Sequence, residues 1–213
     1  MNLQVYPSSK SAPLILLNCY GDEGEGICRA VKELTDRPFS LAVISGLDWN
    51  RDMSPWAAEA VFKGESPFSG GADEYLNELT GKILPSILAD LPTAPTATYI
   101  AGYSMAGLFA LYSLYKTSVF DGAASCSGSL WYPGFREYVD ANEFSHVPSK
   151  VYLSVGDKEA RTRNKLMAMV EENTRAICDL YASRGIDTHF DLNAGNHFSD
   201  AELRTAKGIA WLI

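Results

Sequence analysis

The stretch Gly102-Tyr103-Ser104-Met105-Ala106-Gly107, near the middle of this 213-residue chain, carries its clearest structural signal. A strand-like run at residues 98–101 leads into it. An almost wholly apolar run at residues 108–115, typical of a helix buried against a sheet, leads out of it. The pattern therefore predicts that Ser104 lies on a sharp turn between a strand and a helix.

Such a turn needs small residues on either side of the serine, because the side chains two positions before and two positions after it nearly touch. Gly102 and Ala106 occupy those two positions. Similar short strings occur by chance in ordinary turns, but this one has the strand before it and the helix after it that a nucleophile elbow requires. The sequence thus predicts a serine hydrolase with Ser104 as nucleophile. It also requires an acid and a histidine to follow in that order, each after a strand.

His197 is the histidine best placed to act as the base. It follows a predicted strand at residues 189–193 and directly precedes a predicted helix at residues 199–213. The other two histidines fit worse, since His189 lies inside that strand and His146 lies in a polar linker. We therefore expect His197 to accept the proton of Ser104.

The acid is expected in the loop that follows a predicted strand at residues 151–155, which reads Gly156-Asp157-Lys158-Glu159. Many elbow hydrolases place the acid three residues after this glycine, which favours Glu159. Asp157 is the alternative acid, or it shapes the turn. Either carboxylate could orient His197 and stabilise its protonated form.

Acyl transfer also needs N–H donors where negative charge develops on the carbonyl oxygen. We expect one from the backbone of Met105 and the other from the loop after a predicted strand at residues 14–18. In that loop Tyr20 is favoured and Gly21 is the alternative. The loop also holds three glycines, which fit close approach of a substrate, and three acids, which disfavour an anionic one. These residues are Gly21, Gly24, Gly26, Asp22, Glu23 and Glu25.

Four aromatic residues lie in loops at the same predicted edge of the sheet: Trp49, Trp56, Trp131 and Tyr132. They could line a pocket for the acyl or alcohol part of a substrate, or they could be packing anchors. The first two belong to a long loop at residues 46–71, where a turn of helix is expected near residues 57–62. Loops of that length in compact domains are often functional.

The remaining pattern predicts one α/β domain over residues 1–213, in which a mainly parallel sheet is flanked by helices on both faces. Ligands bind such sheets at the carboxyl ends of the strands. Further strands are expected at residues 3–6, 41–45 and 120–126. Further helices are expected at residues 27–34, 73–91 with a kink at Pro85, 105–115 and 162–183. Ser199 and Glu202 have the spacing of a capping box at the start of the last helix.

Composition excludes several other classes of function. The formal net charge is −8 and no basic stripe is present, so a nucleic-acid partner is not expected. None of the four cysteines forms a CxxC pair, and Cys19 and Cys126 fit as small buried hydrophobes. No His/Cys cluster suggests a metal. No signal pattern opens the chain and no apolar run reaches membrane-spanning length. We therefore expect a cytoplasmic protein with no membrane partner.

The chain resembles the putative-esterase branch of the α/β-hydrolase superfamily. That branch includes esterase D (S-formylglutathione hydrolase), enterochelin-type siderophore esterases, feruloyl esterases and mycolyltransferases. The segments that carry the resemblance are residues 48–56, 102–107, 127–132, 156–159 and 195–198. The resemblance implies the α/β-hydrolase fold, ester hydrolysis through an acyl-enzyme, and no cofactor. It carries over the roles of Ser104, His197 and Glu159.

Two departures from the usual pattern matter. Ala106 replaces the second glycine of the elbow, which the steric argument tolerates. The chain is short and leaves no room for a large lid, so we expect an open, shallow site for small or extended esters. The leading hypothesis is a serine carboxylic-ester hydrolase acting on a small-molecule ester. The alternatives are an acyltransferase that uses the same triad, and a non-catalytic binding module on the hydrolase scaffold.

Overall fold

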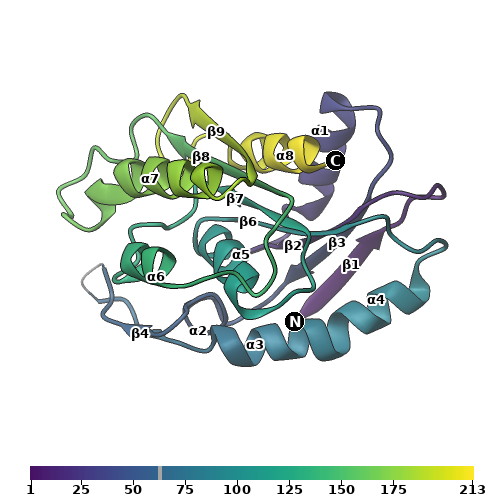
Figure 1. The fold of residues 1–213 in the computed structure, drawn as a ribbon, viewed down its shortest axis with the longest axis horizontal. Coiled ribbons are helices and arrows are strands. Elements are labelled where there is room, and N and C mark those ends of the chain that lie inside the picture. The colour runs from purple at the N-terminus through teal and green to yellow at the C-terminus, as the bar shows by residue number, and fades with distance from the viewer. Residues whose placement is uncertain (62–63) are drawn as a thin grey trace.

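The computed structural model describes residues 1–61 and 64–213 and is built around a seven-stranded sheet (Figure 1). Its spatial order is β1 (Asn2–Tyr6), β3 (Ser40–Ser45), β2 (Leu14–Asn18), β6 (Thr98–Tyr103), β7 (Gly122–Cys126), β8 (Lys150–Gly156) and β9 (Asp187–Asn193). The edge strand β1 pairs antiparallel with β3, and the other neighbours pair in parallel. A separate two-stranded ribbon joins β4 (Ala57–Ala58) and β5 (Phe68–Ser69).

Helices cover both faces of this sheet (Figure 1). One face carries α1 (Gly24–Leu34) and α8 (Ala201–Leu212). The other carries α3 (Ala72–Glu78), α4 (Leu84–Asp90), α5 (Met105–Lys116), α6 (Phe135–Ala141) and α7 (Val170–Ser183). A short helix, α2 (Trp49–Asp52), lies in the loop after β3. The prediction of a mainly parallel sheet flanked on both faces is confirmed.

Strand β2 shows why the sequence requires two layers of helices. Leu14 and Leu16 pack into the core on the α5 side of the sheet, whereas Ile15 and Leu17 pack into the core on the α1 side. Successive side chains of a strand point to opposite faces, so a continuous apolar run is stable only when both faces are covered.

The connections create a crevice between β2 and β6. From β2 the chain continues to β3 on one side, and β6 later pairs with the other side of β2. In open parallel sheets such a switch point leaves a crevice at the carboxyl ends of the two strands, where ligands bind. Tyr20 follows β2 and Ser104 follows β6, so the topology brings both to this crevice.

Two predicted helices are interrupted. Pro85 has no N–H to bond the carbonyl of Gly81, and a π-helical turn, η1 (Leu79–Ile83), comes directly before α4. The helix expected over residues 162–183 begins only with a 3₁₀ turn, η2 (Met167–Met169), followed by α7. The Asn164 side chain accepts hydrogen bonds from the N–H groups of Leu166 and Met167, and its carbonyl accepts the N–H of Ala168, so Asn164 caps helical turns that begin after it.

Other details of the prediction were wrong. The helical turn of the long loop is α2, whereas residues 57–58 are extended and residue 62 lies outside the described residues. The capping box is absent, because Ser199 Oγ accepts the N–H of Asn196 while Asp200 precedes the first turn of α8. Helix α6 was not predicted, since its seven residues are too short for a clear helical period.

Two further observations concern the chain as a whole. Within residues 1–61 and 64–213, no helix combines the length and the apolar character needed to cross a membrane. All four cysteines are free and buried.

Candidate active site

The elbow positions Ser104 between β6 and α5 with a backbone conformation of φ 59° and ψ −124°. A positive φ is unfavourable for a residue with a side chain and persists only where the surroundings impose it. A Cβ on Gly102 would lie 2.5 Å from the Cβ of Ala106. A Cβ on Gly107 would lie 3.0 Å from the carbonyl oxygen of Gly102. Close packing of strand against helix therefore requires these small residues and leaves the Ser104 side chain at the crevice.

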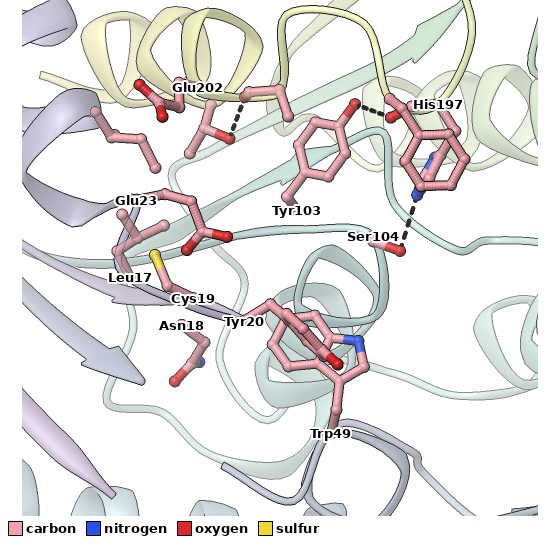
Figure 2. A pocket seen from close by; sticks show the side chains of 14 residues that line it. Leu17, Asn18, Cys19, Tyr20, Glu23, Trp49, Tyr103, Ser104, His197 and Glu202 are labelled. Atoms are coloured by element: carbon pink, nitrogen blue, oxygen red, sulfur yellow. Dashed lines mark hydrogen bonds between the residues drawn. The ribbon is translucent and has the colours of Figure 1, made fainter. Parts of the chain in front are cut away.

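His197 lies within hydrogen-bonding distance of both predicted partners. Its Nε2 is 3.0 Å from Ser104 Oγ, and its Nδ1 is 2.7 Å from Glu159 Oε2 (Figure 2 draws the first contact). Gly195 takes a φ of 104° in the loop after β9, which lets the chain turn sharply two residues before His197. Glu159 reaches the histidine from the loop after β8. Three loops at one edge of the sheet thus bring the three side chains together.

Glu159 is held as a buried carboxylate, with its side chain 4% exposed. One oxygen, Oε1, accepts the Gly156 N–H at 2.6 Å. Burial alone would raise the pKa of this carboxyl. Its hydrogen bond to His197, the charge of that ring when protonated, and hydrogen bonds from Ser127 and Gly156 outweigh the burial and hold the pKa below its usual value. The group is therefore ionised at neutral pH.

Asp157 lies elsewhere in the same loop and has a different set of contacts. Its Oδ1 accepts the N–H of Gly195 at 2.7 Å, and its own N–H donates to the carbonyl of Asn193. These bonds tie the loop after β8 to the loop that carries His197. The structure therefore places Glu159 beside His197, whereas Asp157 shapes the turn.

Arg204, on α8, is a site residue that the sequence reasoning missed. Its side chain is 2% exposed, and its Nη1 donates to Glu159 Oε1 at 3.1 Å. The same nitrogen lies 3.2 Å from the Tyr103 hydroxyl, and Nη2 donates to the carbonyl of Ala194 at 2.9 Å. The available signal was its helical spacing from Ala201 and Gly208, which puts a charge on the apolar face of the last helix. A charge there requires a buried partner.

Two hydroxyl groups close to the Ser104–His197 pair were also missed. Ser129 Oγ lies 3.3 Å from Ser104 Oγ, and the Ser129 N–H donates to the Ser104 carbonyl. The Tyr103 hydroxyl donates to the His197 carbonyl at 2.7 Å, as Figure 2 shows. Both residues lie beside or within segments singled out in the sequence, but spacing alone does not reveal where their hydroxyl groups point.

The backbone donors considered for an oxyanion hole differ in availability. The Gly21 N–H already donates to Glu23 Oε2 at 2.9 Å. Within residues 1–61 and 64–213, the N–H groups of Met105 and Tyr20 have no hydrogen-bond acceptor. The N–H groups of Met105 and Tyr20 are therefore available to a further acceptor, whereas the N–H of Gly21 is already occupied.

We expected Gly24 and Gly26 in a loop that faces the substrate, and this expectation was wrong. Both lie in the first turn of α1. A Cβ on Gly24 would come within 2.7 Å of Val43 Cγ1, and one on Gly26 within 2.9 Å of the Glu202 carboxyl carbon. The two glycines allow α1 to pack closely against β3 and α8.

Two cavities share Ser104 and His197 in their walls. The first, the Trp49 cavity, measures about 360 Å³. The second, the Trp131 cavity, measures about 250 Å³. Besides Ser104 and His197, the Trp49 cavity is bounded by residues that include Leu17, Cys19, Tyr20, Glu23, Ile27, Trp49, Glu202 and Thr205. The Trp131 cavity is bounded by residues that include Phe68, Met105, Ser129, Trp131, Met167 and Val170.

Trp56 and Tyr132, the other two aromatic candidates, line neither cavity. The Trp56 Nε1–H donates to the carbonyl of Pro133 at 2.9 Å, and the Tyr132 hydroxyl donates to the carbonyl of Trp56. Their rings meet edge to face, 5.9 Å apart between centroids. They are packing anchors that hold the long loop to the segment after β7, and they are not part of the candidate pocket.

Comparison with known proteins places this geometry in context. The family model described as Putative esterase matches residues 20–201. The solved IroE-like serine hydrolase from Shewanella oneidensis is similar at a TM-score of 0.78 and 16% identity, covering 99% of this chain and 74% of its own. The siderophore hydrolase EstA from Aspergillus nidulans is similar at a TM-score of 0.70 and 20% identity, covering 96% and 83%.

A third solved structure is the enterobactin hydrolase IroE in complex with DFP. It is similar at a TM-score of 0.65 and 17% identity, covering 99% of this chain and 92% of its own. No curated protein matches the sequence significantly. At these identities the solved structures show a shared fold, and the chain has the α/β-hydrolase fold that the sequence predicted.

Proposed function

The chain belongs to the Putative esterase family, and on that premise we propose that it is a serine hydrolase that cleaves carboxylic esters through an acyl-enzyme on Ser104. One observation carries the proposal. Ser104 Oγ, His197 and Glu159 form a continuous hydrogen-bonded chain with contacts of 3.0 Å and 2.7 Å. The nucleophile of that chain borders both cavities.

In the first half of the reaction, Ser104 Oγ attacks the ester carbonyl while His197 Nε2 takes its proton. Glu159 accepts a hydrogen bond from Nδ1, which keeps the neutral ring in the tautomer that can receive a proton at Nε2. The carboxylate also stabilises the imidazolium that forms. His197 then gives the proton to the leaving alcohol, and the acyl group stays on Ser104.

In the second half, a water molecule takes the place of the alcohol. His197 removes its proton as it attacks the acyl carbonyl, and the proton returns to Ser104 as the acid product leaves. The free N–H groups of Met105 and Tyr20 would bind the carbonyl oxygen when it becomes negatively charged in each half. Arg204 is a positioning residue in this scheme, because it holds the Glu159 oxygen that does not face His197.

The two carboxylates of the loop after β8 provide a matched test of this assignment. Glu159→Gln is expected to lower kcat/KM by about 10³–10⁴-fold, since the amide cannot stabilise the imidazolium. Asp157→Asn keeps an oxygen that can accept the Gly195 N–H, so its kcat/KM is expected to stay within about tenfold of wild type. Steady-state kinetics on p-nitrophenyl acetate measures both. The reverse order of effects would assign the acid to Asp157.

The proposed activity is tested with purified protein and p-nitrophenyl esters of graded acyl length, with and without added alcohols and thiols. We expect release of p-nitrophenol together with the free acid. Formation of an acylated alcohol or thiol in place of the free acid would make the enzyme an acyltransferase. Absence of turnover above that of buffer, in protein shown to be folded by circular dichroism, would overturn the proposal in favour of a binding module.

A further inference from the structure

The Ser104–His197 pair lies where two cavities meet, and this suggests the kind of ester that fits. Both cavities include Ser104, His197 and Phe198 in their walls, and their other lining residues are all different. Pockets of a few hundred Å³ with mainly apolar walls are typical of small-molecule sites. A substrate with one small group would leave one of the two cavities filled with water against apolar walls.

The Trp49 cavity has an apolar floor and an acidic far end. Leu17 and Ile27 contribute apolar wall, and the Tyr20 and Trp49 rings meet edge to face with centroids 5.3 Å apart. Figure 2 shows Ser104 and His197 at one end of this cavity, with Glu23 and Glu202 at the other.

The charges around this cavity are one-sided. Among the described residues that line it, Glu23 and Glu202 are acidic, and none is a lysine or an arginine. Burial first, and then the carboxylates of Glu23 and Glu202, raise the pKa of the Cys19 thiol in the cavity wall to about 12. A ligand group with negative charge would meet the same repulsion as the Cys19 thiolate.

The Trp131 cavity differs in its walls. Phe68, Trp131, Met167 and Val170 give it an aromatic and aliphatic lining from β5, the segment after β7, η2 and the start of α7. Asn50, Glu65 and Glu159 add polar groups to the same lining. Ser129 and Met105 border it near the nucleophile. This cavity therefore suits an apolar group next to the scissile bond.

Two aromatic rings that border the cavities are largely exposed to solvent, although each has one edge-to-face neighbour. Phe198 is 88% exposed and borders both cavities, with its ring edge-on to His197 at 5.4 Å between centroids. Tyr20 is 73% exposed and borders the Trp49 cavity. Exposed apolar surface at a concave site favours a ligand that removes it from water. An ester lying between these rings would cover both.

Resting on the proposed function, we infer that the substrate is an ester with a sizeable apolar group on each side of the scissile bond, and that the half bound in the Trp49 cavity carries no negative charge. The two halves occupy different cavities, and the bond between them lies against Ser104 under Phe198. An amine at the end of the half in the Trp49 cavity is favoured over a carboxylate, because it would lie near Glu23 and Glu202.

The test on the wild-type enzyme is a matched set of esters: acetyl or phenylpropanoyl as the acyl part, and methyl or phenylethyl as the alcohol part. We expect kcat/KM for the ester with both large groups to exceed that of either ester with one large group by about tenfold or more. Equal values for the ester with two large groups and an ester with one would overturn the inference. Turnover of p-nitrophenyl acetate, measured in parallel, reports separately on the proposed function.

Two truncations assign the halves. Trp49→Ala and Met167→Ala each shorten a partly exposed wall of one cavity. Each is expected to reduce the gain from one large group only, and the two variants should act on opposite halves of the ester. If both variants reduce the gain in kcat/KM from the same large group, or if neither reduces any gain, the two-cavity arrangement is wrong.

The last experiment tests how the charge of the substrate affects kcat/KM. We compare esters that carry an amine, an amide or a carboxylate at the end of one half, namely the half whose gain in kcat/KM is reduced in Trp49→Ala. At low salt we expect the amine to exceed the carboxylate in kcat/KM by about tenfold or more, with a smaller ratio in 1 M salt. Glu23→Gln should reduce this ratio, whereas the control Glu33→Gln, exposed on α1 outside both cavities, should leave it unchanged. A carboxylate-bearing ester that is the better substrate would contradict the inference.

Discussion

Replacement of Ser104 by Ala is expected to lower kcat/KM for p-nitrophenyl acetate by about 10⁴–10⁶-fold. Without Oγ no acyl-enzyme can form, and water would have to attack the ester directly. Whatever rate remains would come from the Met105 and Tyr20 N–H groups and from binding in the two cavities. Steady-state kinetics on the purified variant provides the measurement, with the detection limit set by the buffer rate.

The fold should tolerate this change. The Ser104 Oγ bonds to His197 and Ser129, and alanine removes a single oxygen from a partly exposed side chain. Ser183→Ala, at an exposed serine at the end of α7, is the matched control and should have wild-type kinetics. A Ser104→Ala enzyme that keeps more than a tenth of wild-type kcat/KM would mean that another group performs the hydrolysis.

Replacement of His197 by Gln is expected to lower kcat/KM by about 10⁴–10⁶-fold as well. Of the two side chains that the structure places within hydrogen-bonding distance of Ser104 Oγ, His197 is basic and Ser129 is not. Glutamine can still hydrogen-bond Glu159 but is not basic at neutral pH. Assays across the pH range at which the protein stays folded measure the effect. The loss should persist at every pH, since no base is restored by deprotonation.

His189→Gln is the control for this substitution. His189 stacks on Tyr152, with 5.6 Å between the ring centroids, and its Nε2 bonds Asp191 on β9. Its kcat/KM should stay within about twofold of wild type, because surface changes away from a site have small effects. An equal loss in both variants would mean that the histidines act through folding, and it would remove the proposed base.

The sequence was most informative where local sterics and chain order act together. The elbow could be predicted because Gly102 and Ala106 are needed wherever a serine turns sharply from β6 into α5. The loop histidine and the glutamate after β8 could be predicted because parallel strands end at one edge of the sheet. Each of these inferences depends on short-range pattern plus topology.

The sequence was least informative where a role depends on contacts between distant segments. Arg204 meets Glu159 45 residues away, and Trp56 meets the backbone of Pro133 77 residues away. The helical spacing of Arg204 marks a charge on the apolar face of α8 but does not identify Glu159 as its partner. Local spacing likewise does not reveal the contact of Trp56, so this tryptophan was assigned to the pocket. Helix boundaries show a different limit, because Asn164 caps the helical turns that lead into α7 and so moves their start past residue 162.

The central claim is that Ser104 is an activated nucleophile, and covalent labelling tests it most directly. Folded protein is incubated with a fluorophosphonate, its intact mass is measured, and the modified residue is located by peptide mapping. We predict one adduct per chain, on Ser104, and none on Ser104→Ala. Folded wild-type protein that stays unlabelled, or that carries its adduct on another residue, would contradict the account.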